Sequence, residues 1–174
     1  MYAFNLTRNV KTVKPLLEVK ESVHGSKLKD DLIGVTKSAE RYAKGDMIVA
    51  AYLEKKIVAY LFAATTDTWV GEVEDMLRVK SNEVYFYDAF TLPPYRGKGL
   101  YPYLLCVAAS YFQRQSFSCA LIFSAAGNQS SIKGIQKSGF RYYGSVYYRN
   151  LFGWRSWYYR VGERHVESRF ACEG

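Results

Sequence analysis

The fold of this chain is decided by the stretch Tyr85-Phe86-Tyr87-Asp88-Ala89-Phe90-Thr91-Leu92-Pro93-Pro94-Tyr95-Arg96-Gly97-Lys98-Gly99-Leu100-Tyr101. Residues 84–92 are aromatic and β-branched, which favours an extended strand. Pro93-Pro94 ends that strand, because proline has no N–H to offer a strand ladder. The glycines of Arg96-Gly97-Lys98-Gly99 let the backbone approach a ligand before a helix expected at about 100–114. A helix start attracts phosphate, so the stretch predicts a pyrophosphate site.

Two better-known phosphate-binding glycine loops do not fit this stretch. A P-loop requires Gly-x-x-x-x-Gly-Lys followed by Ser or Thr, whereas Lys98 is followed by Gly99. A dinucleotide-binding fingerprint requires a third glycine and an acidic residue about 20 positions further on, and the sequence has neither. The loop is therefore either a phosphate-binding turn of another class or only a solvated turn.

The segment Arg96-Gly97-Lys98-Gly99-Leu100-Tyr101 resembles the Arg/Gln-x-x-Gly-x-Gly/Ala signature of the GNAT superfamily of N-acetyltransferases. The approach 91–95 is similar to the strand and turn that precede this signature in the family. One position departs from the pattern, because Tyr101 stands where Gly or Ala is usual. The departure bears on how closely the backbone there can approach a phosphate.

A second segment, 128–140, resembles the GNAT pattern Asn-x-x-Ala-x-x-x-Tyr-x-Lys-x-Gly-Phe. Asn128 and Lys137 fall in register, as do the Gly139-Phe140 pair, while Ser131 replaces Ala. The distance between the two motifs suits the helix and strand that separate them in the family. Two weak motifs at the right separation make a specific combination over about 87–140.

The resemblance implies acetyl-CoA as co-substrate. The strand before the signature would splay from the next strand, and coenzyme A would lie in the opening. Thioester and pantetheine would lie near Thr91 and Leu92, the pyrophosphate would bind backbone N–H groups of 96–101, and Asn128 would bond the pantetheine arm. The expected cofactor-binding residues are Phe90, Thr91, Leu92, Arg96, Gly97, Lys98, Gly99, Leu100, Tyr101, Asn128 and Ser131.

The chemistry requires a base for the attacking amine and a proton for the leaving thiolate. We expect Asp88 to be the base, because alternation with Phe86 and Phe90 would point its carboxylate to an apolar face. Glu74 is the second choice. Ile135 occupies the position of the family's usual tyrosine acid, so either another group supplies the proton or none is needed.

The order of expected elements predicts an α/β (α+β) chain with one mixed, mostly antiparallel, splayed sheet flanked by helices. We expect one GNAT-like domain over 1–174, with a CoA-binding core at about 84–140 and a C-terminal hairpin at about 140–161. The other expected elements are a strand at 2–6, a short helix within 9–24, a helix from Ser26 to Tyr42 stopped by Gly45, a hairpin of 47–53 and 57–64, a strand with a long loop in 65–82, a strand at 118–125, a helix at 130–137 capped by Gly139, and strands at 140–149 and 154–161.

Composition limits the class of protein. The 174 residues carry a formal charge of +8, which favours anionic partners. No basic leader precedes an apolar run, and no apolar run is long enough to span a membrane. The cysteines at 106, 119 and 172 form no metal-binding pattern and no disulfide framework, which predicts no metal site and a cytoplasmic location.

These observations leave the acceptor open. The basic charge and the aromatic C-terminal end favour an anionic small-molecule amine, such as a nucleotide-linked amino sugar. The alternative is a non-catalytic CoA-binding or sensor module, which the departures at Tyr101 and Ile135 favour. Residues 142–160 are either a stacking surface for sugars or bases or the packed faces of a hairpin, and a homodimer through them stays open. The sequence contains no recognised nucleic-acid-binding motif.

Overall fold

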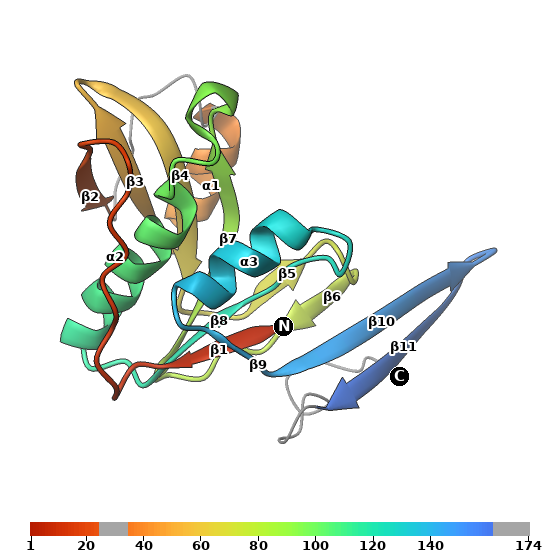
Figure 1. The fold of residues 1–174 in the computed structure, drawn as a ribbon. Coiled ribbons are helices and arrows are strands. Elements are labelled where there is room, and N and C mark those ends of the chain that lie inside the picture. Colours follow the sequence, from red (N-terminus) through yellow and green to blue (C-terminus); the bar gives the residue numbers. More distant parts are fainter. Residues whose placement is uncertain (25–34, 162–174) are drawn as a thin grey trace.

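The computed structural model describes residues 1–24 and 35–161, which fold around a seven-stranded sheet of order β2-β3-β4-β7-β8-β1-β9 (Figure 1). Two smaller hairpins, β5–β6 and β10–β11, accompany it in this part of the chain. The elements are β1 (Tyr2–Asn5), β2 (Lys20–His24), α1 (Val35–Ala43), β3 (Met47–Leu53), β4 (Lys56–Ala64), β5 (Thr68–Val70), β6 (Asp75–Leu77), β7 (Glu83–Thr91), a 3-10 turn (Pro93–Tyr95), α2 (Leu100–Arg114), β8 (Cys119–Ile122), α3 (Gln129–Lys137), β9 (Arg141–Tyr142), β10 (Gly144–Leu151) and β11 (Trp154–Val161).

Neighbouring strands of the large sheet are antiparallel except at its centre. There β7 and β8 run parallel, with Glu83 opposite Cys119 and Phe86 opposite Ile122. Beyond Phe86, strand β7 continues along β4 as far as Thr91, whereas β8 ends at Ile122. The two central strands therefore separate, and the predicted mixed and splayed sheet is confirmed.

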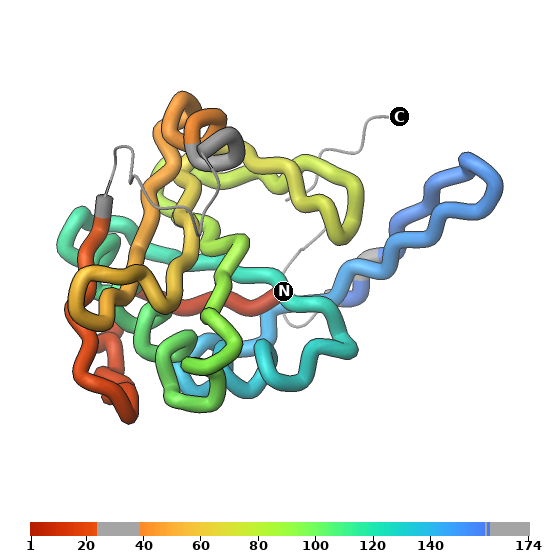
Figure 2. Tube along the Cα trace, turned by 90° about the horizontal axis from the view of Figure 1, so that it is seen from above, coloured from red at the N-terminus to blue at the C-terminus, as the bar shows by residue number. Residues whose placement is uncertain are grey.

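Alternating side chains on β3 and β4 face two different layers. Val49, Leu61 and Ala63 join the core cluster that contains Leu104 and Ala108 of α2. The intervening side chains Ile48, Ala50, Tyr60 and Phe62 form a second cluster, in which Tyr42 of α1 packs. Figure 1 shows α2 and α3 in front of the sheet and α1 behind it, and Figure 2 shows the same layers from above.

The β5–β6 hairpin covers the second face beyond α1. Val70, Val73 and Leu77 pack with Tyr85 of β7 and Leu121 of β8 in a third buried cluster. Tyr85 stacks on Tyr87, with ring centroids 5.6 Å apart, so aromatic side chains continue along this face toward Phe62. This hairpin is what the sequence predicted only as a strand with a long loop.

The predicted β3–β4 hairpin is confirmed, and so are α2, α3 and β11. The strand predicted at 140–149 is divided, because 141–142 pair with β1 as β9 and the hairpin strand β10 runs from Gly144 to Leu151. Pro102 is tolerated in the first turn of α2, where a backbone N–H has no partner within the helix. The continuous apolar run at β8 is buried on both faces, as expected for a central strand with a parallel neighbour. Gly139 adopts φ 92° after α3 and serves as the predicted stop.

The short helix predicted within 9–24 is wrong. Residues 9–19 are irregular, and 20–24 form the edge strand β2 along β3. Glu21 and Val23 pair with β3, and this pairing supplies backbone hydrogen bonds. The stabilisation from strand pairing outweighs the weak helix propensity of the segment. The predicted helix from Ser26 begins outside the described residues, and α1 is described from Val35; Gly45 follows it at φ 84°.

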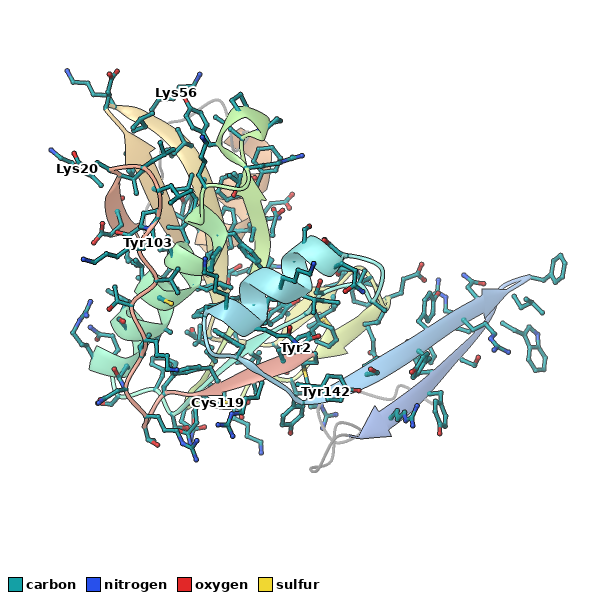
Figure 3. All side chains as sticks on the ribbon, viewed as in Figure 1. Tyr2, Lys20, Lys56, Tyr103, Cys119 and Tyr142 are labelled. Atoms are coloured by element: carbon teal, nitrogen blue, oxygen red, sulfur yellow. The ribbon has the colours of Figure 1, made fainter. Side chains whose placement is uncertain are left out.

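The β10–β11 hairpin projects from the body and pairs with no other strand of the described chain (Figures 1 and 2). At its foot, Tyr142 lies edge-on to Tyr2, with ring centroids 5.9 Å apart (Figure 3). One of its faces contacts the β5–β6 turn, where the indole of Trp157 donates to the Val73 carbonyl at 2.8 Å. The hairpin is thus held at its base and middle while its tip stands free.

Candidate active site

A β-bulge interrupts β7 where it leaves β8. The register passes from Tyr60 opposite Phe90 to Phe62 opposite Tyr87, so Asp88 and Ala89 both lie opposite Leu61. Asp88 adopts φ 44°, a left-handed conformation that Asp tolerates better than most residues. A bulge leaves one residue outside the regular ladder and turns the strand, which places its backbone at the opening between β7 and β8.

The prediction that Asp88 points to an apolar face is wrong. The extra residue at the bulge breaks the alternation with Phe86 and Phe90, and the side chain of Asp88 is 40% exposed. Its carboxylate forms a salt bridge of 2.5 Å with Arg41 of α1. The Arg41 guanidinium also lies over the ring of Phe62, 4.2 Å from the centroid, so α1 holds the Asp88 side chain in place.

A cavity of about 780 Å³ fills the opening between the separated strands. Its walls come from the bulged half of β7, the glycine-rich loop, the first turn of α2, the segment after β8, and α3. The lining residues are Glu72, Tyr87, Asp88, Ala89, Phe90, Thr91, Tyr95, Arg96, Gly97, Gly99, Leu100, Tyr101, Pro102, Ile122, Phe123, Ser124, Ala125, Asn128, Ser130, Ser131, Gly134 and Lys137. The structure thereby brings together most of the residues predicted to bind cofactor.

The start of α2 opens into this cavity without a side-chain cap. Gly99 is the N-cap residue with φ 78°, no side chain caps the helix, and its first turn contains no acidic residue. Gly97 has φ 73°, so both glycines adopt a backbone conformation that other residues rarely reach. Uncapped N–H groups and the helix dipole favour an anion here.

Arg96 belongs to the same wall. Its Nε donates to the carbonyl of Thr91 at 3.1 Å, and its guanidinium lies 5.8 Å from the centroid of Phe90. These contacts fold the side chain back over the end of β7. The positive charge of Arg96 is therefore held beside the glycine-rich turn.

Asn128 caps α3 in addition to lining the cavity. Its side-chain oxygen accepts from the backbone N–H of Ser131 at 3.1 Å and from the hydroxyl of Ser130 at 2.9 Å. Asn128 is therefore the N-cap of α3, a position that asparagine favours. Because Oδ1 already accepts these two hydrogen bonds, the Asn128 amide would contact a bound molecule through Nδ2, as a donor.

Tyr101 crosses from α2 to α3. Its hydroxyl lies 3.3 Å from the hydroxyl of Ser131, and its ring lies against the bare Cα of Gly134. Burial raises the pKa of the Tyr101 phenol, so the side chain is neutral. The departure from the family pattern at 101 is accommodated by a glycine on the facing helix.

Several predicted residues lie away from the cavity wall. Leu92 packs partly buried against the main core, and the Lys98 carbonyl accepts from the N–H of Leu16 at 2.8 Å. Glu74 accepts from the hydroxyl of Tyr148 and contacts Arg155 at 3.5 Å. Ile135 is fully buried in the core that contains α2, so this position faces away from the opening.

Four cavity residues with ionisable side chains were not predicted as site residues. Glu72, from the β5–β6 turn, adds a second carboxylate, and Lys137, at the end of α3, adds a second cation. Tyr87 and Tyr95 line the cavity as well. No local sequence signal marks Glu72, because only the packing of its hairpin on the sheet brings it here. Tyr87 could have been found from its place next to Asp88.

Tyr87 is tied to a buried acid. Its hydroxyl donates to the carboxylate of Asp46, which is 3% exposed. Burial and the neighbouring Asp46 carboxylate raise the pKa of Tyr87 well above its ordinary value. Burial also raises the pKa of Asp46, although Tyr87, Lys44 and Arg41 partly oppose the rise.

Within 1–24 and 35–161, no group of three His, Cys, Asp or Glu residues could hold a metal ion. No helix in the same residues is long and apolar enough to cross a membrane.

A scan against models of known protein families gives no match, and neither does a search of curated protein sequences. Solved structures do match. An aminoglycoside 6'-N-acetyltransferase from Acinetobacter haemolyticus superposes with a TM-score of 0.54 at 17% identity, over 78% of this chain and 98% of its own.

The chain has a GNAT-like fold. A second aminoglycoside N-acetyltransferase, solved with CoA bound, matches with a TM-score of 0.52 at 14% identity over 77% of this chain and 99% of its own. A third, from Acinetobacter baumannii, matches with a TM-score of 0.51 at 19% identity over 72% and 84%. At such identities the likeness concerns the fold, which the two sequence motifs had predicted.

Proposed function

We propose that this protein transfers an acetyl group, or another short acyl group, from acyl-CoA to a primary amine. The observation that carries the proposal is the cavity between β7 and β8, because it joins the bulge at Asp88 to the uncapped start of α2. A long cofactor with a phosphate group in its middle and a thioester at one end fits this arrangement. The matching structure with bound CoA supports the same cofactor.

The glycine-rich loop and α2 would hold the pyrophosphate. Gly97, Gly99, Leu100 and Tyr101 line the cavity at a helix start that favours anions, and their backbone N–H groups would bind the phosphate oxygens. Arg96 and Lys137 would add positive charge. Asn128 would donate from Nδ2 to the pantetheine arm, and the β7 backbone at Phe90 and Thr91 would lie along the same arm. We do not assign Leu92 or Lys98 a side-chain contact, because neither lines the cavity.

The bulge of β7 would carry the chemistry. A backbone N–H outside the regular ladder, at Asp88 or Ala89, would stabilise the oxyanion that forms when the amine attacks the thioester. Asp88 would take the proton from the amine, directly or through water. We prefer Asp88 over Glu74, because Asp88 lines the cavity and Glu74 is engaged with Tyr148 and Arg155. Glu72, which also lines the cavity, is the alternative base.

The leaving thiolate needs a proton or can leave as it is, since thiols ionise near pKa 8.5. Ile135 cannot supply the proton, because it is aliphatic and buried. Tyr87, Tyr95 and Tyr101 are the phenols that line the cavity, and the first and last already contact Asp46 and Ser131. The tyrosines 142, 143, 147 and 148 do not line it.

The overall composition and the cavity favour acceptor amines of opposite charge. The net charge of +8 favours an anionic acceptor such as a nucleotide-linked amino sugar. Once Arg96 and Lys137 are assigned to cofactor phosphates, the charged groups left on the wall are the carboxylates Glu72 and Asp88. These favour an amine that arrives as a cation. Initial rates with amino sugars, nucleotide-linked amino sugars and polyamines decide between the two classes.

Calorimetry with acetyl-CoA, desulfo-CoA and adenosine 3',5'-bisphosphate tests the cofactor. We expect acetyl-CoA to bind and Gly99→Val to weaken it, because valine resists the φ of 78° and adds bulk at the helix start. In the same protein, Asp88→Asn should keep CoA affinity and lower turnover by about 10²- to 10⁴-fold. CoA binding without turnover of any amine would favour the alternative, a CoA-binding sensor module. Absence of CoA binding would contradict both.

A further inference from the structure

The two faces of the β10–β11 hairpin differ in what they contact. Cross-strand partners share a face, so Tyr148 and Trp157 lie together, with ring centroids 5.6 Å apart, on the face that contacts the β5–β6 turn. The opposite face, here called the outer face, carries the alternate pairs. They are Ser145 with Arg160, Tyr147 with Tyr158, Arg149 with Ser156, and Leu151 with Trp154. Tyr147, Tyr158, Leu151 and Trp154 are among the most exposed large apolar side chains of the described chain.

The tip of the hairpin is apolar and stands in solvent. Leu151 is 62% exposed, Phe152 101% and Trp154 86%. Phe152 and Gly153 form the two-residue turn, with φ of 50° and 89°. Such a turn needs positive φ at both positions and favours Asn or Gly at the first, where a bulky side chain is strained.

Phe152 therefore gives the fold no stability, for two reasons. Its backbone is in a conformation that phenylalanine rarely adopts, and its ring contributes no burial. Asparagine in its place would relieve the first cost and remove the second. A side chain with no benefit to folding points to a benefit from something that contacts it.

The charge of the hairpin indicates what that contact is. Residues 144–161 include Arg149, Arg155 and Arg160 and no Asp or Glu. Arg149 and Arg160 lie on the outer face with Tyr147 and Tyr158, behind the apolar tip. Aromatic and apolar side chains ahead of arginines are the composition that partitions into the interface of a membrane with anionic lipids.

We propose that the β10–β11 hairpin binds the surface of an anionic lipid bilayer. Leu151, Phe152 and Trp154 enter the interface between head groups and acyl chains, and Arg149 and Arg160 bind lipid phosphates. Figure 3 shows the hairpin reaching away from the body, opposite the end that carries Lys56, so the tip can reach a flat surface before the rest of the protein does. The proposal does not depend on the acyltransferase activity.

Two other partners fit the same face less well. A second copy joined through a two-fold axis would place outer face against outer face and bring arginines of like charge together. A single-stranded nucleic acid would stack on Tyr147, Tyr158 and Trp154. It would gain little from Leu151 or from an aromatic ring held at a strained turn.

Sedimentation of the full chain with vesicles tests the proposal. We expect binding to vesicles of phosphatidylcholine mixed with phosphatidylglycerol, weaker binding to phosphatidylcholine alone, and loss of binding as salt increases. Phe152→Asn should lower partitioning roughly tenfold, because one buried aromatic side chain is lost, while raising the melting temperature. A purely structural role for Phe152 predicts the opposite sign for the melting temperature.

Matched variants separate specific from general effects. Arg149→Gln with Arg160→Gln removes two charges from the outer face, and Lys55→Gln with Lys56→Gln removes two from the distant β3–β4 turn. Trp154→Ser removes an exposed aromatic residue from the tip, and its control, Trp69→Ser, removes one from β5. Only the variants of the hairpin should release the protein from anionic vesicles.

Four outcomes would overturn the proposal. The first is absence of binding to anionic vesicles, and the second is equal binding by wild type and Phe152→Asn. The third is light scattering that shows a dimer converted to a monomer by Phe152→Asn, which would assign the tip to a second copy of this chain. Tighter binding to oligonucleotides than to vesicles, lost in Trp154→Ser, would likewise assign the face to nucleic acid.

Discussion

The ring of Tyr101 on α2 lies directly against the bare Cα of Gly134 on α3. A Cβ built on Gly134 would lie 2.6 Å from Cδ1 of Tyr101, closer than carbon atoms approach without displacement. The absent side chain at 134 and the large one at 101 are thus complementary. The contact closes the gap between the two helices that border the cavity.

A double-mutant cycle tests this complementarity. Alanine is preferred over glycine in a helix by about 1 kcal/mol, so Gly134→Ala should stabilise α3 in the Tyr101→Ala background. In wild type the same change should instead cost about 1–3 kcal/mol, because the ring must move. Urea unfolding of the four proteins gives the coupling energy. Equal effects of Gly134→Ala in both backgrounds would contradict the contact.

Ile135→Tyr should not create a proton donor for the thiolate. Ile135 is fully buried in the core beside α2, so a tyrosine there overfills the core and should lower stability by about 1–3 kcal/mol. Thermal unfolding and steady-state rates check this together. A rise in turnover at unchanged stability would show that position 135 faces the cavity after all.

Asp46→Asn should raise stability at neutral pH and leave it unchanged in acid. Burial raises the folded-state pKa of Asp46 above its ordinary 3.8. A raised carboxyl pKa means that its stabilising contribution is present at low pH and is lost as pH rises through the folded pKa. Asparagine does not titrate and can still accept from Tyr87.

The free energy of unfolding of wild type and Asp46→Asn, measured by urea titration from mildly acidic to neutral pH, should therefore diverge as pH rises. Glu40→Gln, on the exposed side of α1, is the matched control and should follow wild type. Parallel curves for Asp46→Asn and wild type would mean that the Asp46 carboxylate is stabilised by its partners as well as it would be in water.

Glu74→Gln should separate the two acids that the sequence offered as base. Glu74 contacts Tyr148 and Arg155 of the C-terminal hairpin, so its loss should speed amide hydrogen exchange in β10 and β11. Turnover should change less than about threefold, whereas Asp88→Asn should lower it by at least about 10²-fold. The reverse ranking of the two variants would make Glu74 the base.

Much of this protein was determined by local sequence. The strands β3, β4, β7 and β8, the helices α2 and α3, the glycine-rich turn and the GNAT-like fold follow from apolar periodicity, proline and glycine positions, and two spaced motifs. These signals depend on residues close together in the chain, so they can be recognised without the tertiary structure. The part of the cavity wall formed by Arg96, Gly97, Gly99, Leu100, Tyr101 and Asn128 was predicted for that reason.

Contacts between distant segments decided the rest. A bulge of one residue turned Asp88 away from the apolar face and toward Arg41, 47 positions away. Packing of the β5–β6 hairpin brought Glu72 to the cavity and took Glu74 to the C-terminal hairpin. Core packing took Ile135 inward. No local pattern encodes these outcomes, because each depends on the packing of side chains from elements that are far apart in the sequence.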